Sequence, residues 1–203
     1  GCLAPADDDS AELRELLQEL RSKGYSRSAM VERCGEVLDG KTELTLNFGM
    51  ETEIFGVIVE ALKYDNSRGG LLTSISGLRS NCDPRGIDIE EVEQQRIAPN
   101  CQQIAEVLLL PNNYVKLCLR CISMEDDGCI AIANALRTNN TITHVDLCNN
   151  RINNGGMALA DCLMTNNTIT NLDLCDNEIA DDGGIAIATA LEMNTSLVSL
   201  DLR

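Results

Sequence analysis

A helical segment that recurs about every 28 residues constrains this chain more than any other feature. Each copy has a large aliphatic residue, a small or β-branched apolar residue, a polar residue, another small or branched apolar residue, and then Leu. Apolar residues at positions i, i+1, i+3 and i+4 lie on one face of a helix, so each copy predicts a helix with one buried side. The copies are Ile58–Leu62, Ile104–Leu108, Ile132–Leu136, Leu159–Leu163 and Ile187–Leu191, and their first residues are 46, 28, 27 and 28 residues apart.

A short segment of alternating apolar and other residues lies between successive helices, and another follows the last helix, at the same spacing. Alternation of apolar and other residues with period two predicts a strand that buries one face. Polar turns rich in Asn and Thr lead from helix to strand, and Gly-containing loops lead from strand to helix. The predicted strands are Leu117-Cys-Leu119, Val145-Asp-Leu147, Leu172-Asp-Leu174 and Leu200-Asp-Leu202.

A unit of one strand and one helix cannot bury its apolar face alone, but stacked units bury a continuous core. The strands then align into a parallel sheet on one side, and the helices line the other. Helices are about 10 Å wide, whereas strands are about 4.8 Å apart, so the stack curves. The predicted fold class is therefore α/β: a horseshoe-shaped solenoid with parallel strands on the concave face and α-helices on the convex face.

The repeats resemble leucine-rich repeats of the ribonuclease-inhibitor-like class, which carry an α-helix in every unit. In that family the unit reads Leu-x-Leu-x-x-Asn-x-Ile, then Gly, then Leu-Ala-x-Ala-Leu. The Asn is matched at Asn150 and Asn177, whose amides can donate to and accept from turn backbone, so both are predicted to be structural. Leu174–Leu191 matches this pattern almost throughout, and Leu147–Leu163 matches it with one residue missing before the helix. Leu119–Leu136 departs from it at two positions, with Ile122 in place of Asn and Met124 in place of Ile.

Two regions are predicted along the chain. Residues 1–43 form an acidic N-terminal segment and a helical cap, because Leu13, Leu16, Leu17 and Leu20 share one helix face and a second helix runs near residues 28–38. Residues 44–203 form the repeats. A strand is predicted near Leu71 or Leu72, and its helix, at 102–108, comes late, so an insertion is placed at about 76–100.

The chain stops after a strand with no helix behind it. An exposed apolar strand edge is an aggregation hazard. We therefore expect either that the C-terminal end is truncated from a longer protein or that a partner covers this edge.

Composition excludes several functions. The chain has 16 Lys and Arg against 32 Asp and Glu, a net charge of −16, and aromatic residues make up 2%. Such a charge repels a phosphate backbone, and few rings are present to stack on bases, so no nucleic-acid partner is expected. No apolar run reaches the roughly 20 residues of a membrane span.

The N-terminal Gly1-Cys2 resembles the start of an acylated protein if a Met is removed before it. Pro5 and the acidic residues 7–9 argue against lipidation, so membrane attachment is not expected. The ten cysteines are spread over a chain long enough to fold without disulfides, which favours reduced intracellular thiols. A secreted, disulfide-bonded protein is the alternative.

No catalytic, metal or cofactor site is predicted. Cys118 and Cys121 form a lone CxxC, whereas zinc needs about four ligands. His144 is the single histidine and has no nucleophile in a recognisable context. Cys148 and Cys175 share one position in the repeat, where a bridge requires oxidation and suitable geometry.

The concave strand face is the predicted recognition surface. Its central column holds Cys118, Asp146, Asp173 and Asp201, and three stacked carboxylates would be relieved by a partner with a basic surface. The alternative is that Leu-Asp-Leu is simply common in this repeat family. The candidate partner-binding residues are Asp146, Asp173, Asp201, Arg120, His144 and Asp176.

These features predict a non-catalytic leucine-rich-repeat module for protein–protein interaction. We expect a cytoplasmic scaffold subunit of a larger assembly, such as a cytoskeletal or ciliary complex. A second possibility is a GTPase-activating protein resembling the Ran activator, for which Arg120 and Arg151 are the candidate residues. A third is the sensor tail of an intracellular immune receptor, which needs a nucleotide-binding domain upstream.

Overall fold

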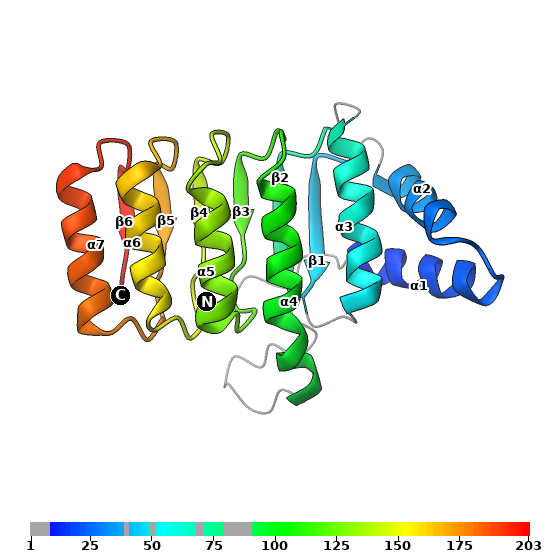
Figure 1. Ribbon diagram of the computed structural model, residues 1–203, viewed down its shortest axis with the longest axis horizontal. Coiled ribbons are helices and arrows are strands. Elements are labelled where there is room, and N and C mark those ends of the chain that lie inside the picture. Colours follow the sequence, from blue (N-terminus) through cyan, green and yellow to red (C-terminus); the bar gives the residue numbers. More distant parts are fainter. Residues whose placement is uncertain (1–8, 39–40, 49–51, 68–70, 79–90) are drawn as a thin grey trace.

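The computed structural model describes residues 9–38, 41–48, 52–67, 71–78 and 91–203. These residues form two layers, a parallel sheet and a row of helices on one of its faces (Figure 1). Gly1 and Cys2, where acylation was considered and not expected, lie outside the described residues. The strands are β1 (Glu43–Asn47), β2 (Ser74–Leu78), β3 (Lys116–Cys118), β4 (His144–Asp146), β5 (Asn171–Asp173) and β6 (Ser199–Asp201).

The strands follow one another in sequence order across the sheet, and every neighbouring pair is parallel. This is the order that a row of identical strand–helix units produces. Between the strands lie α3 (Thr52–Ser67), α4 (Glu91–Leu108), α5 (Glu125–Leu136), α6 (Gly155–Thr165) and α7 (Asp181–Met193), all on the same side of the sheet (Figure 1). The parallel α/β arrangement predicted for the repeats is thus observed, with six strands in the sheet.

One apolar residue per strand points from the sheet toward the helices. Strand pairing aligns these residues in a single row, and alternation with period two leaves their neighbours on the opposite face. The row is buried except at its last member, which is half-buried. It consists of Leu44, Ile75, Leu117, Val145, Leu172 and Leu200.

The helices lie close together because small residues face their neighbours. A Cβ added to Gly156 in α6 would lie 3.4 Å from the Cα of Gly183 in α7. A Cβ on Gly155 would lie 3.0 Å from the Cβ of Cys129 in α5. Among the helices that the structure describes, none combines the length and apolar composition that crossing a membrane requires.

Two helices cover the β1 end of the stack, where a cap was predicted. They are α1 (Asp9–Ser22) and α2 (Arg27–Leu38), and Figure 1 shows them beyond α3 at one end of the row. Leu13, Leu17 and Leu20 of α1 are buried. Arg27 of α2 forms an ion pair with Glu60 of α3 at 2.7 Å, which joins the cap to the first repeat helix.

The second unit differs from its predicted form. Its strand begins at Ser74, and Ile75, rather than Leu71 or Leu72, pairs with Leu44. The first unit is therefore 31 residues long at this point, and extrapolating the 28-residue spacing of the later copies gave the wrong position.

The predicted insertion at about 76–100 is also too wide. Residues 76–78 belong to β2, and α4 starts at Glu91 instead of 102, while 79–90 lie outside the described residues. The extra helical turns are held by Ile97 and Cys101, which continue the buried stripe toward the N-terminus. Buried Asn100 also donates to the carbonyl oxygen of Phe48 at 2.9 Å. The acidic residues before this stripe made it resemble a loop.

Candidate protein-binding face

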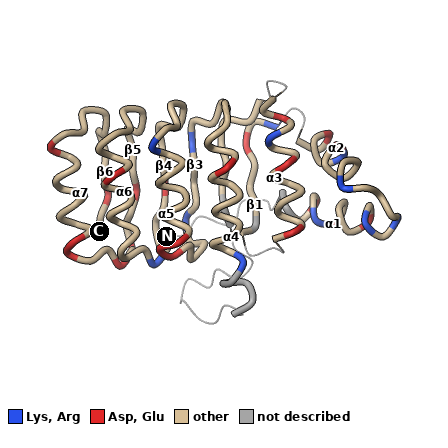
Figure 2. The backbone as a smooth tube through the Cα atoms, in the orientation of Figure 1, with Lys and Arg blue, Asp and Glu red and all other residues tan. Residues whose placement is uncertain are grey.

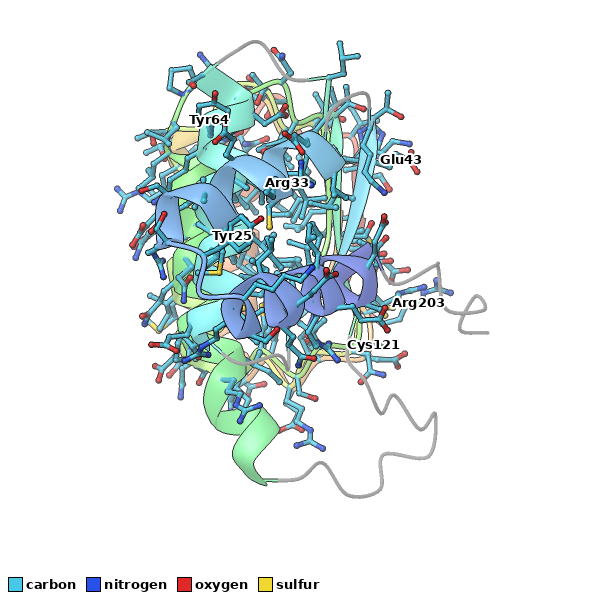
Figure 3. The ribbon with its side chains drawn as sticks, turned by 90° about the vertical axis from the view of Figure 1, so that its right-hand side faces the viewer. Tyr25, Arg33, Glu43, Tyr64, Cys121 and Arg203 are labelled. Atoms are coloured by element: carbon cyan, nitrogen blue, oxygen red, sulfur yellow. The ribbon has the colours of Figure 1, made fainter. Side chains whose placement is uncertain are left out.

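The face of the sheet that points away from the helices is called here the open sheet face. No described helix covers it, and Figure 3 shows Glu43 and Arg203 on this side of the molecule. Strand pairing arranges its side chains in columns, one residue per strand. The entry column is Glu43, Ser74, Lys116, His144, Asn171 and Ser199, and the central column is Thr45, Ser76, Cys118, Asp146, Asp173 and Asp201.

The predicted aspartate column is present, but its charge is balanced within the chain. Asp146 pairs in register with Asp173, and Asp173 with Asp201. Arg120 reaches both inner carboxylates, with Nε 3.6 Å from Oδ2 of Asp146 and Nη2 3.6 Å from Oδ2 of Asp173. Arg203 binds Asp201 with Nη2 at 2.6 Å from Oδ2. The like-charge repulsion from which we inferred a basic partner is therefore largely relieved by two arginines of the chain itself.

The two arginines affect the column differently. Hydrogen bonding to Arg203 lowers the pKa of Asp201 to about 2. The Arg120 side chain is about one-third exposed, so its ion pairs are partly screened and contribute about 1 kcal/mol or less. Figure 2 shows acidic and basic positions interspersed along the repeats. The sequence could have revealed the Arg120 pairing, because Arg120 follows Cys118 by two residues and so points to the same face one strand away from Asp146.

Each column aspartate also has a role inside its own unit. Oδ1 of Asp146 accepts a hydrogen bond from the backbone N–H of Cys148, and Oδ1 of Asp173 accepts one from Cys175, both at 3.0 Å. Asp201 makes the same contact with Arg203 at 3.1 Å. A side chain that binds the backbone two residues on stabilises a turn. This role accounts for the recurrence of Leu-Asp-Leu without any partner.

Asn150 lies at the turn after β4 and is fully buried. Its Oδ1 accepts from the backbone N–H of Ile122 at 3.1 Å and of Met124 at 3.3 Å. Its Nδ2 donates to the carbonyl oxygens of Leu119 at 2.7 Å and Leu147 at 2.9 Å. These bonds satisfy turn groups of two neighbouring units, which is the structural role that the repeat pattern predicts for this residue.

Asn177 occupies the same position one unit later. Its Oδ1 accepts from the backbone of Asn150 at 3.0 Å and Ile152 at 3.1 Å. Its Nδ2 donates to the carbonyl oxygens of Leu147 and Leu174, both at 2.9 Å. The two asparagines therefore form a ladder that fixes the loop edge of the sheet.

A second asparagine ladder lies at the opposite edge, where the helices end. Asn166 donates from Nδ2 to the carbonyl oxygens of Leu136 and Asn139, and its Oδ1 accepts from the backbone of Ile169 at 2.9 Å. Asn139 and Asn194 repeat this pattern in the flanking units. With both edges tied, the strands between them form a stiff platform for the open sheet face.

The remaining predicted residues lie at the edges of this face. His144 is exposed, and its Nδ1 is 2.7 Å from Oγ1 of Thr143. Asp176 is exposed in the loop beyond β5, where its backbone has φ of 52°. Of the two arginines considered for a GTPase contact, Arg120 is held in its ion pairs, whereas Arg151 is exposed on the loop after β4.

Two cysteines meet beside the aspartate column. The Sγ atoms of Cys148 and Cys175 are 2.7 Å apart, and together with a carboxylate oxygen of Asp173 they fall within 4.8 Å of one another. The two thiols share one repeat position in the sequence, but the repeat pattern gives no sign that Asp173 lies beside them. Arg120 Nη2 is 3.8 Å from Cys175 Sγ, so a guanidinium already contacts part of this set. That no metal binds here stays a prediction.

A separate pocket of about 390 Å³ lies between α1, α2 and α3. Its lining includes the apolar side chains of Leu17, Met30 and Val57. Arg21 and Glu53, also part of the lining, form an ion pair at 3.5 Å. None of the residues singled out from the sequence for partner binding lines this pocket, so it is distinct from the open sheet face.

Comparison with known proteins gives a resemblance in structure only. No protein-family model and no curated protein matches the chain. A structure described as leiomodin-1 actin-binding site 2 is similar with a TM-score of 0.49 and 22% identity, covering 85% of this chain and 76% of that one. A tropomodulin C-terminal domain from Caenorhabditis elegans has a TM-score of 0.48 and 10% identity, covering 88% and 83%. With TM-scores below 0.5, neither likeness bears on what this chain binds.

Proposed function

We propose that this chain is a non-catalytic leucine-rich-repeat module that binds another protein through the open sheet face. The observation that carries the proposal is a sheet of six parallel strands with one face covered by helices and the other covered by no described helix. From β3 to β6, asparagine ladders tie neighbouring units at both edges of the sheet. A surface held in one conformation loses little entropy when a partner binds, which favours recognition.

The curvature expected of the stack favours the same face. Helices are about 10 Å wide and strands are about 4.8 Å apart, so we expect the sheet to be the concave side. A concave surface contacts a rounded partner over several repeats at once. Exposed Lys116, His144 and Ser199 on the entry column, with half-buried Asn171, are available for such contacts.

The net charge suggests which partner surface is attracted. The chain carries −16 overall, and a charge of this size steers a basic partner toward it through long-range attraction. Close to the sheet the attraction is weaker, because Arg120 and Arg203 balance the aspartate column. A basic partner should therefore associate more slowly as salt rises, while its affinity depends on the uncharged contacts as well.

A scaffold in a cytoskeletal assembly is the setting we propose for this module. Because the proposed setting is cytoskeletal, actin is the first protein to include in a binding assay. Monomeric and filamentous actin can each be mixed with the purified chain and followed by sedimentation. Binding to neither form would exclude actin as the partner. Binding of another protein through the open sheet face would then be tested by the substitutions below.

The face hypothesis is tested by two matched substitutions. Asn171→Arg places a long charged side chain on the open sheet face, and Asn134→Arg places the same side chain on the exposed surface of α5. We expect a protein captured by the unmodified chain to be lost with Asn171→Arg and retained with Asn134→Arg. Equal capture by both variants, or loss only with Asn134→Arg, would contradict binding through the sheet.

The absence of catalysis is tested separately. Purified chain is added to loaded small GTPases, including Ran, and GTP hydrolysis is measured over time. We expect no acceleration. Acceleration that Arg151→Ala abolishes would replace the binding-module proposal with a GTPase-activating function.

A further inference from the structure

Cys148 and Cys175 are held side by side by the backbone. They lie two residues beyond Asp146 and Asp173, which pair in register on β4 and β5. The parallel hydrogen bonding continues past these strands, because the N–H of Asn149 donates to the carbonyl oxygen of Cys175 at 2.9 Å. Backbone pairing therefore places the two cysteines side by side, and their Sγ atoms lie 2.7 Å apart.

The other described cysteines are placed differently. Cys34, Cys101, Cys129 and Cys162 are buried inside the molecule. In the CxxC, the Cys118 thiol lies 3.7 Å from a carboxylate oxygen of Asp146, and Cys121 Sγ lies 3.5 Å from Nδ2 of Asn149. Cys175 is partly exposed, as are Cys118 and Cys121, but its thiol directly contacts a second thiol, that of buried Cys148.

The charges around the pair favour thiol chemistry over a metal ion. Arg120 Nη2 is 3.8 Å from Cys175 Sγ and 3.6 Å from Oδ2 of Asp173. These are two of the three atoms that a cation would need, and a guanidinium close to both repels a second cation. The same guanidinium works against the rise that burial causes in the pKa of the Cys148 thiol, and the thiolate is the species that reacts with disulfides.

We propose that Cys148 and Cys175 form a reversible redox pair that takes a low-molecular-weight disulfide, such as oxidised glutathione, as its oxidant. The Cys175 thiolate attacks one sulfur of the oxidant, forming a mixed disulfide and releasing one glutathione thiolate. Cys148, after losing its proton, attacks Cys175 Sγ and releases the second glutathione. The two protein thiols lose two electrons, glutathione disulfide gains them, and the released protons yield two molecules of reduced glutathione.

The pKa values of the two thiols affect the rate of this exchange, whereas the proximity of the thiols affects how much of the bridge is present at equilibrium. Contact with Cys148 raises the pKa of Cys175 to about 12, and burial raises the pKa of Cys148. Few thiolates are therefore present near neutral pH, and exchange is slow. Measurement at equilibrium avoids this limit, because the proximity of the two thiols favours the bridge over two separate mixed disulfides.

The test uses the whole chain in glutathione redox buffers, followed by acid quenching, alkylation and tryptic mass spectrometry. Cleavage after Arg151 separates the two cysteines, so a bridge links peptide 138–151 to peptide 152–203 with the loss of two hydrogens. We expect this species to exceed mixed disulfides at either cysteine by about 10-fold. Cys118→Ser, a control on the same face, should leave it unchanged, while Cys148→Ser and Cys175→Ser should abolish it.

Several outcomes would overturn the proposal. One is mixed disulfides without a bridge in a chain whose circular dichroism shows that it is folded. Another is a linked peptide that persists in Cys175→Ser, which would assign the bridge to Cys162 in the same peptide. A third is protection of both thiols from alkylation that a chelator removes, with no loss of two hydrogens from the peptides. This result would indicate a metal site. None of these outcomes depends on whether the open sheet face binds a protein.

Discussion

Replacing Asn150 by alanine should remove more stability than any change to an exposed asparagine. Asn150 is fully buried at the turn after β4, and its amide joins this turn to the preceding unit. Alanine keeps the backbone but removes both the acceptor and the donor. The substitution therefore leaves polar groups of two units without the partner that the asparagine supplies.

The size of the effect follows from the groups left behind. The N–H groups of Ile122 and Met124 lose their acceptor, and the carbonyl oxygen of Leu119 loses its 2.7 Å donor. The carbonyl oxygen of Leu147 keeps a second donor, Nδ2 of Asn177 at 2.9 Å. Three orphaned groups at about 1 kcal/mol each give a loss of about 3 kcal/mol, a large part of the roughly 5–15 kcal/mol that stabilises a domain.

Urea unfolding followed by circular dichroism measures this loss directly. The exposed Asn134 on α5 provides the control, and Asn134→Ala should change the free energy of unfolding by less than about 0.5 kcal/mol. The denaturant slope should stay the same in both variants if only the native state has changed. A loss below about 1 kcal/mol for Asn150→Ala would refute the claim that these bonds hold adjacent units together.

Two further predictions concern packing and ionisation. A Cβ on Gly183 would lie 3.0 Å from Ile179 Cγ2, whereas a Cβ on Gly184 would meet nothing within 4 Å. In thermal unfolding, the Gly184→Ala variant should therefore be more stable than the Gly183→Ala variant by about 1 kcal/mol. Equal stability of the two variants would contradict this packing. Burial raises the pKa of Tyr114, whose hydroxyl is 3.1 Å from Oδ1 of Asn66. The folded chain thus keeps a proton that the unfolded chain loses above about pH 10, so stability should fall as pH rises beyond that point. The absorbance change near 295 nm that Tyr114→Phe removes should appear only as the chain unfolds; its appearance in the folded chain would count against this burial.

The sequence predicts the regular part of the fold because the same repeat pattern determines the strands, their buried residues and their pairing. In units β3 to β6, alternation around Leu117, Val145, Leu172 and Leu200 defines the buried row, and strand pairing shows the same residues in register. The asparagine ladder is predictable for the same reason, since an amide at a fixed repeat position meets the same backbone groups in each unit.

Features specific to one unit are not predictable from the repeat. The early start of α4 goes with Ile97, which is buried in the core, and Asn100, which donates to the carbonyl oxygen of Phe48. The charge balance of the open sheet face depends on Arg120, a position occupied by Cys in the next two units. The repeat pattern shows only three stacked aspartates. In the structure these aspartates stabilise turns and pair with two arginines.

Covalent footprinting of the chain with its captured partner tests binding through the open sheet face most directly. Lys116 and His144 are exposed on this face and can be acylated, while Met157 and Met164 are exposed on α6 and can be oxidised. We expect the partner to slow labelling of Lys116 and His144 and to leave oxidation of both methionines unchanged. Protection of the two methionines, with Lys116 and His144 labelled as fast as in the free chain, would contradict it.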